Sequence, residues 1–175
     1  MKIFSTLALA GVLAVPMFSA DAVTKAAPPS TNKGAPVTPT LSMVDAVVTA
    51  PFVLKDGAIS QQSQTEVTGG GKAVFTFMVA QAGNYVIHAV ASAPDEDSNS
   101  FFLNIDAQPE DPLMIWDMEV TKGFEERIVS WRGNGDSGSD EYAPKIFKLT
   151  AGEHKLIIVG REPSFLKSVS ICLAK

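Results

Sequence analysis

Asp95, Asp97 and Asn99 lie in one oxygen-rich loop and alternate in the way that begins a calcium-binding loop. Carboxylate and amide oxygens are the ligands that calcium takes in proteins. The sixth position of the loop is Ser100, however, where the calcium loop requires glycine, and a strand pattern follows at once. The sequence therefore favours a solvated loop, keeps calcium as the weaker prediction, and predicts no other cofactor.

Gly135–Gly138 matches the core of the nucleophile motif of chymotrypsin-like proteases, with His88 and Asp106 before it in the expected order. The histidine and aspartate of such a site need loop positions that converge on the serine. His88 and Asp106 instead fall within or at the end of predicted strands, and Ser139 and Asp140 stand where the motif continues with glycine and proline. No spacing singles out a pair of catalytic carboxylates either. We therefore expect no catalytic residues and a protein that is not an enzyme.

The composition of the 175 residues excludes several other kinds of site. A net charge of −5 argues against a broad nucleic-acid-binding surface. A single cysteine, Cys172, rules out a disulfide framework and a zinc site built on several thiolates. Because Cys172 falls in an apolar-rich strand pattern, we expect its thiol to be buried and inert.

The start of the chain predicts export. Residues 1–22 have a lysine, an apolar run and then small residues, which is the pattern of a secretory signal peptide cleaved after Ala22. The run is too short for a lasting membrane span. Residues 23–40 are rich in proline, threonine and alanine and predict an extended linker. We therefore expect a secreted, periplasmic or cell-surface protein with one domain over 41–175.

From residue 41 onward the apolar residues repeat with a period of two, which is typical of strands. Turn signals at 81–84 and 150–153 separate such runs at hairpin length, and the spacing predicts eight to ten short antiparallel strands. The sequence therefore predicts an all-β fold, a two-sheet antiparallel β-sandwich or jelly roll. The clearest alternating runs are 72–79, 85–90, 101–106, 155–161 and 167–173.

Four blocks follow one another in a specific order: GNYVIHAVASAP, NSFFLNID, the tryptophan-bearing strand Val129–Arg132, and FKLTAGEHKLIIVGREPSFLKSVSI. In this order they resemble the galactose-binding-like jelly rolls, close to carbohydrate-binding modules of families 6 and 35. The resemblance covers about Leu41 to Leu173. It implies a non-catalytic domain that binds a glycan or polysaccharide by stacking a sugar on loop aromatics, one of them near Trp131. The C–H face of a sugar ring packs on a flat aromatic face, and polar groups bond its hydroxyls.

Six residues are the ligand-binding candidates under this resemblance, and each has a structural alternative. The two tryptophans could instead belong to the core, and the tyrosine could anchor its loop. The arginine–glutamate pair could recognise hydroxyls or a carboxylated sugar, or form a salt bridge that pins the last hairpin. The candidates are Trp131, Arg132, Tyr142, Arg161, Glu162 and Trp116.

The sequence departs from the family pattern in two places. Residues 59–67 lack the second aromatic that often completes a sugar sandwich. Lys167 stands where an aspartate commonly helps to hold a structural calcium, and a cation cannot ligate calcium. Two functional hypotheses therefore remain: a carbohydrate-binding module, and a structural or adhesive subunit of a surface assembly. In the second, the fold would serve protein contacts and residues 23–40 would add a strand to a neighbour.

Overall fold

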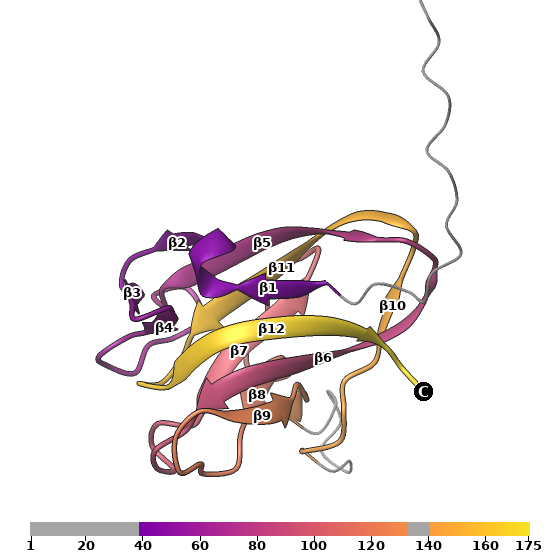
Figure 1. Cartoon of the computed structure of the whole chain (residues 1–175). Helices are drawn as coiled ribbons and strands as arrows, with labels where there is room; N and C mark the ends of the chain where they lie inside the picture. The colour runs from indigo at the N-terminus through magenta and orange to yellow at the C-terminus, as the bar shows by residue number, and fades with distance from the viewer. Residues whose placement is uncertain (1–38, 133–140) are drawn as a thin grey trace, which may run out of the picture. The chain divides into compact units, whose positions relative to one another are not determined.

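The computed structural model describes residues 39–132 and 141–175, and in these ranges the chain forms twelve strands in two antiparallel sheets (Figure 1). The predicted signal peptide, most of the predicted linker and the motif Gly135–Gly138 lie outside the described residues. The predicted antiparallel β-sandwich is confirmed. The one described helical element is the short 3-10 helix η1 (Met43–Asp45).

The larger sheet has seven strands. Five of them follow the order β10-β6-β12-β4-β3, while β1 also pairs with β12 and β9 also pairs with β6. The pairing β6–β12 is its centre, running from Phe165 opposite Ser92 to Leu173 opposite Tyr85. Its strands are β1 (Thr40–Ser42), β3 (Val53–Lys55), β4 (Ala58–Ser60), β6 (Gly83–Ser92), β9 (Glu125–Ile128), β10 (Phe147–Leu149) and β12 (Phe165–Leu173).

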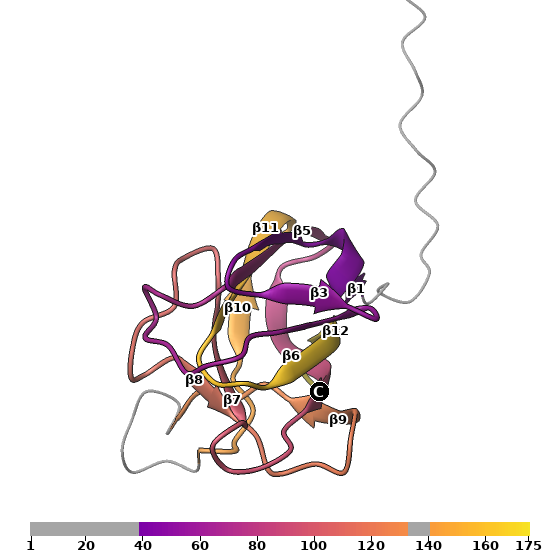
Figure 2. The same cartoon turned by 90° about the vertical axis from the view of Figure 1, so that its left-hand side faces the viewer.

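The smaller sheet has five strands in the order β2-β5-β11-β7-β8. β11 pairs with β5 on one side and with β7 on the other, and Figure 2 shows the two layers from the side. Its strands are β2 (Val47–Thr49), β5 (Lys72–Val79), β7 (Ser100–Ile105), β8 (Ile115–Asp117) and β11 (Gly152–Gly160).

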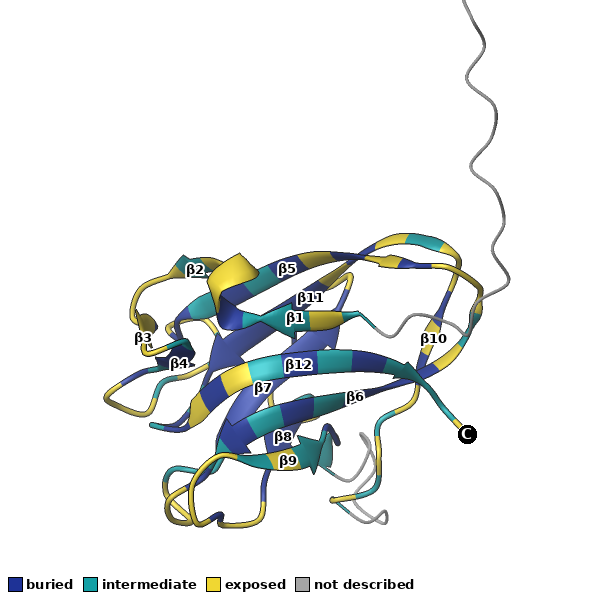
Figure 3. Cartoon of the chain, viewed as in Figure 1, coloured by how far each residue is buried: buried dark blue, intermediate teal, exposed yellow. Residues whose placement is uncertain are grey.

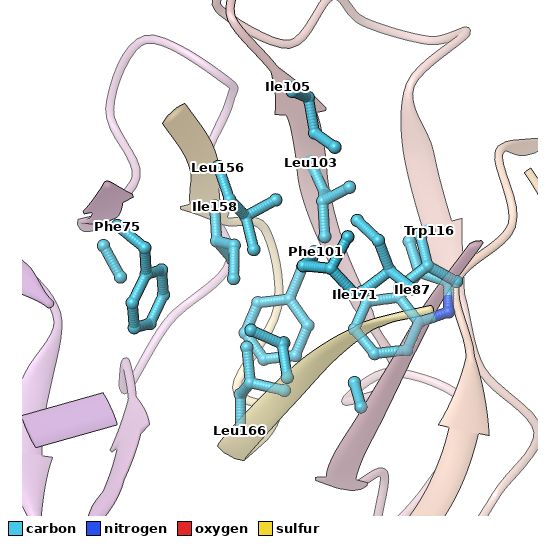
Figure 4. Packing of buried hydrophobic residues seen from close by; sticks show 14 of the residues in the cluster. Phe75, Ile87, Phe101, Leu103, Ile105, Trp116, Leu156, Ile158, Leu166 and Ile171 are labelled. Carbon is cyan, nitrogen blue, oxygen red and sulfur yellow. The ribbon is translucent and has the colours of Figure 1, made fainter. Parts of the chain in front are cut away.

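The core fills the space between the sheets, and Figure 4 shows part of it. Strand β5 buries Ala73, Phe75, Phe77 and Val79, so the alternation of its sequence matches its two faces. β7 differs, because all six of its residues are buried and its ribbon is dark blue in Figure 3. Its outer face contributes to a second apolar cluster, made of Phe102, Ile115, Ile157 and Val159.

Three details differ from the expectations drawn from the sequence. The expected strand Val129–Arg132 is wrong, because β9 ends at Ile128 and only Ser130 forms an isolated bridge, with Pro144. Several of the twelve strands are only three residues long, too short to show a period of two, which explains why eight to ten were expected.

Cys172 is half-exposed instead of buried, so the expectation of a buried thiol is wrong. The pairing of β12 shifts between Leu166 and Ser168, after which Val169 and Ile171 face the core and Cys172 faces outward.

Candidate functional site

A cleft of about 640 Å³ lies where several loops meet at one end of the sandwich. Strand register brings these loops together: Ser100 pairs with Asp117, and Gly160 pairs with Phe101. The start of β7 and the ends of β8 and β11 therefore share one end of the smaller sheet. Four of the six candidate residues line this cleft: Arg132, Tyr142, Arg161 and Glu162.

Arg132 is fixed on the cleft wall by a two-pronged ion pair with Asp117. Its Nε donates to Asp117 Oδ2 at 2.8 Å and its Nη2 donates to Oδ1 at 2.9 Å. Only 9% of the Asp117 side chain is exposed, against 41% of the Arg132 side chain. The hydrogen bond with Asp117 raises the pKa of the Arg132 guanidinium above its ordinary value, so the group stays charged.

Glu162 is the centre of a second buried network on the cleft wall. Its Oε2 accepts from Ser100 Oγ at 2.6 Å and from the backbone N–H of Asn99 at 3.2 Å. Arg161 forms an ion pair with its other oxygen and donates from Nη1 to Ser100 Oγ at 2.7 Å. These bonds tie the β6–β7 loop to the β11–β12 turn and give this side of the cleft a fixed shape.

Tyr142 presents the exposed aromatic side chain of the cleft, with 44% of its surface accessible. A hydrogen bond with the Glu141 side chain, with some help from burial, raises the pKa of its phenol. The hydroxyl therefore stays protonated at neutral pH. An aromatic side chain that is held by its polar tip and is partly exposed suits contact with an amphipathic ligand.

Carboxylates outnumber guanidinium groups five to two among the residues that line the cleft. Asp117 and Glu162 are matched by the two arginines, while the side chains of Glu96 and Glu119 are exposed. The wall is therefore rich in acceptors and negative in charge. Such a wall favours hydroxyl donors and disfavours an anionic ligand.

The two tryptophans do not line this cleft. Trp116 is fully buried, its ring stacks on Phe101, and its Nε1 donates to the carbonyl of Ile128 at 3.1 Å. It lines the smaller of two adjoining hollows but has no exposed surface, so its place is the core, the structural alternative for this residue, and Figure 4 shows it among the core side chains. The reason is that β8 is buried on both faces.

Trp131 is partly buried and packs against the core. Its Nε1 donates to the carbonyl of Leu103 at 2.9 Å, and its ring meets Phe147 edge-on. Lys145 Nζ lies 3.9 Å from the ring centre, over one face. One face of the ring is thus covered by a side chain of the protein itself.

The three weak calcium candidates are spread over the β6–β7 loop. Asp95 Oδ1 accepts from the backbone N–H of Asp97 at 3.1 Å, which is the bond of an Asx turn. Asn99 lines the cleft. Within the described ranges, no three His, Cys, Asp or Glu side chains are grouped so that they could hold a metal ion.

Several residues that hold the candidate side chains in place were not among the candidates drawn from the sequence. Asp117, Ser100 and Glu141 hold candidate side chains in place, yet each is a common residue type in an unremarkable position. Asp117 lies 15 residues before Arg132 and meets it only through the tertiary fold. The one local signal is that Asp117 ends a strand, where side chains often turn towards a binding surface.

The sequence matches no protein-family model and no curated protein. Solved structures are similar in fold. A family 35 carbohydrate-binding module from Clostridium thermocellum has a TM-score of 0.54 at 10% identity, covering 81% of this chain and 100% of that chain. The C-terminal family 6 module of a laminarinase from Zobellia galactanivorans has a TM-score of 0.51 at 9% identity, covering 78% of this chain and 99% of that chain.

A β-(1,4)-mannanase from Podospora anserina, which joins family 26 and family 35 parts, has a TM-score of 0.54 at 13% identity. The match covers 79% of this chain but only 28% of the mannanase. The predicted likeness to jelly-roll modules of families 6 and 35 is therefore confirmed at the level of the fold. No helix in the described ranges is long and apolar enough to cross a membrane.

Proposed function

We propose that this chain is an exported, non-catalytic carbohydrate-binding module whose ligand occupies the cleft beside Tyr142. The observation that carries the proposal is that the exposed Tyr142 lines the same cleft as Arg132, which Asp117 holds in place. The ring packs on the C–H face of a sugar, and the surrounding carboxylates and guanidinium groups bond its hydroxyls. The shared fold supports the proposal, although fold alone does not determine function.

The charge of the cleft narrows the ligand to neutral glycans. Five carboxylates face two guanidinium groups, and both of these are paired within the protein. A carboxylated sugar would meet a surplus of negative charge with no uncommitted cation on the described wall to balance it. Neutral hydroxyls instead find acceptors in Glu96 and Glu119.

Affinity gel electrophoresis tests the proposal directly. The secreted chain is run through gels that contain mannan, laminarin, xylan, galactan or the anionic polygalacturonate. We expect at least one neutral polysaccharide to retard the protein and polygalacturonate to leave it unretarded. Tyr142→Ala should weaken retardation roughly 10-fold or more, because losing a buried aromatic contact costs on the order of 1.5–3 kcal/mol.

Phe165→Ala is the matched control, because Phe165 is a similarly exposed aromatic outside the cleft. It should bind as the unchanged protein does. If no polysaccharide retards the folded protein, the carbohydrate-binding proposal is wrong. If Tyr142→Ala folds and binds normally, the ligand lies elsewhere on the molecule.

A second candidate function is a structural or adhesive subunit, and one apolar surface favours it. Phe124 and Phe165 line a hollow of about 270 Å³ on the larger sheet, and Val53 pairs with Ser60 beside them. Phe124, Phe165 and Val53 are 46%, 39% and 54% exposed, which is unusual for a group of neighbouring apolar residues. Light scattering after size-exclusion chromatography tests this second function. The function predicts that the unchanged chain self-associates and that Phe124→Ser abolishes the self-association.

A further inference from the structure

A smaller hollow of about 210 Å³ adjoins the cleft. The two share four wall residues: Asp117, Met118, Glu119 and Tyr142. Arg127 and Ile128 of strand β9 and the buried Trp116 of β8 line the smaller hollow but not the cleft. At about 30 Å³ per water molecule, this space holds roughly seven waters, which is the size class of one sugar ring and not of a longer chain.

Tyr142 and Glu119 are the exposed residues at the boundary between the two spaces, and Tyr142 is the aromatic one. It borders both, and 44% of its surface is accessible. Asp117 and Met118, which also border both, are buried, so they form the floor and not the boundary. A ligand that occupied both spaces would therefore meet Tyr142 and Glu119 at the boundary, where the Tyr142 ring offers an aromatic contact and Glu119 a carboxylate.

The walls of the smaller hollow have the mixed chemistry that a sugar ring needs. Met118 and Ile128 supply apolar surface. Arg127 supplies a guanidinium group, whose Nη1 donates to the carbonyl of Glu126 at 3.0 Å and whose Nη2 donates to Glu125 Oε2 at 2.8 Å. An apolar wall with one polar anchor is typical of small-molecule sites.

Arg127 also has hydrogen-bonding capacity that the described protein leaves unused. Its Nε is buried and has no partner among the described residues. The side chain as a whole is 23% exposed. A buried donor without a partner costs free energy, so a ligand hydroxyl that accepted from this N–H would recover that cost.

We propose that the smaller hollow is a second sugar subsite, so that the module binds a glycan of at least two residues lying across Tyr142. One sugar unit lies in the cleft beside Tyr142 and the next lies in the hollow, where Arg127 donates a hydrogen bond to a sugar hydroxyl. This inference rests on the proposed function and adds the length of the ligand and the role of Arg127. A single sugar fills only one of the two spaces and therefore binds more weakly.

Calorimetry on the full chain tests the proposal with β-1,4-manno-oligosaccharides and β-1,3-gluco-oligosaccharides of one to four residues. In the series that binds, we expect affinity to rise at least 10-fold from one sugar unit to two. Arg127→Ala should remove most of this gain and leave the affinity for the single sugar unchanged. Arg127→Lys keeps the charge but lacks the Nε–H, so it should restore only part of the gain.

Lys167→Ala serves as the control, because it removes an exposed cation that lines neither space. It should leave every affinity unchanged. Equal affinity for one and two residues overturns the second subsite while the proposed function stands. An Arg127→Ala protein that loses single-sugar and two-sugar affinity equally also overturns it. If the unchanged chain binds neither series, both the proposed function for these glycans and this inference fail.

Discussion

Asp117 and Arg132 form a two-pronged contact in which both carboxylate oxygens accept from the guanidinium, at 2.8 and 2.9 Å. Asp117 is buried at the end of β8, and Arg132 reaches it from beyond the end of β9. The planar fork of arginine matches a carboxylate in only one orientation. The remaining N–H groups of Arg132 are therefore held in fixed directions on the cleft wall.

Asp117→Asn should disturb both stability and binding. An amide can accept only one of the two bonds, and charge-assisted bonds each contribute about 1.5–3 kcal/mol. Because Arg132 is partly exposed, we expect the free energy of unfolding in urea to fall by about 1–3 kcal/mol. Glycan affinity should fall as well, because Arg132 loses its fixed orientation. Asp111→Asn, an exposed aspartate in the β7–β8 loop, is the control, and an unaltered urea midpoint for Asp117→Asn would contradict the argument.

The sequence predicts the long strands well because burial follows its alternation. In β5 the large apolar residues Phe75 and Phe77 face the core, while Thr76 and Met78 face solvent. In β8 the same reasoning fails, since Trp116 lies in a strand that is buried on both faces. No alternation distinguishes a buried tryptophan from a ligand-binding one there.

The sequence predicts only part of the cleft, because most of its contacts join residues that are distant in the sequence. Arg161 and Glu162 are adjacent, so their ion pair follows from local proximity. Arg132 finds Asp117 15 residues away, and Glu162 finds Ser100 at a separation of 62. Such pairings depend on strand register, which no local pattern specifies. The approach of Lys145 to Trp131 likewise becomes visible only in three dimensions.

The three consecutive glycines at 69–71 indicate a loop in the sequence. In the structure they differ in how much space a side chain would have. A Cβ on Gly71 would collide with the backbone nitrogen and side chain of Phe52, whereas one on Gly69 would meet nothing closer than 3.8 Å. We therefore expect Gly71→Ala to lower the free energy of unfolding by about 1–3 kcal/mol or more, as overpacking does. Gly69→Ala should change it by less than about 0.5 kcal/mol. Equal urea midpoints for the two variants would refute this distinction.

His154 and Asp106 form a clasp at the opposite end of β11 from the cleft turn. Nδ1 of His154 lies 2.6 Å from Asp106 Oδ2, and Nε2 lies 2.9 Å from the carbonyl oxygen of Thr150. Both nitrogens face acceptors, so the doubly protonated ring satisfies both contacts. Burial alone lowers the pKa of His154, but the hydrogen bonds to Asp106 and Thr150 outweigh it and hold the pKa above its ordinary 6.5.

The clasp makes stability depend on pH in a defined direction. A raised histidine pKa contributes stability that is complete below pH 6.5 and is lost as the pH rises through the folded-state pKa. Burial raises the pKa of Asp106, but bonds from His154 and from the Lys155 N–H bring it below 3.8, so its contribution disappears only in stronger acid. The difference in unfolding free energy between the unchanged protein and Asp106→Asn should therefore be largest from about pH 4 to 6.5 and narrow above it. A gap that widens with rising pH would contradict the protonated clasp.

A comparison of Trp131 with Tyr142 distinguishes a structural aromatic residue from a ligand-binding one. Its ring packs on the core, its Nε1 bonds Leu103, and Lys145 covers one face. We expect Trp131→Ala to lower the free energy of unfolding by about 2–4 kcal/mol, somewhat below the range for a fully buried aromatic. Tyr142→Ala should lower it by less than about 1 kcal/mol, because its ring is exposed.

Binding should show the reverse order. At a temperature where Trp131→Ala is still folded, its affinity for a retarding polysaccharide should stay within about 3-fold of the unchanged protein, while Tyr142→Ala loses roughly 10-fold or more. Urea unfolding and affinity gels on the same preparations give both quantities. If Trp131→Ala instead keeps its stability and loses binding, Lys145 does not shield the ring from the sugar, and the ligand stacks on Trp131.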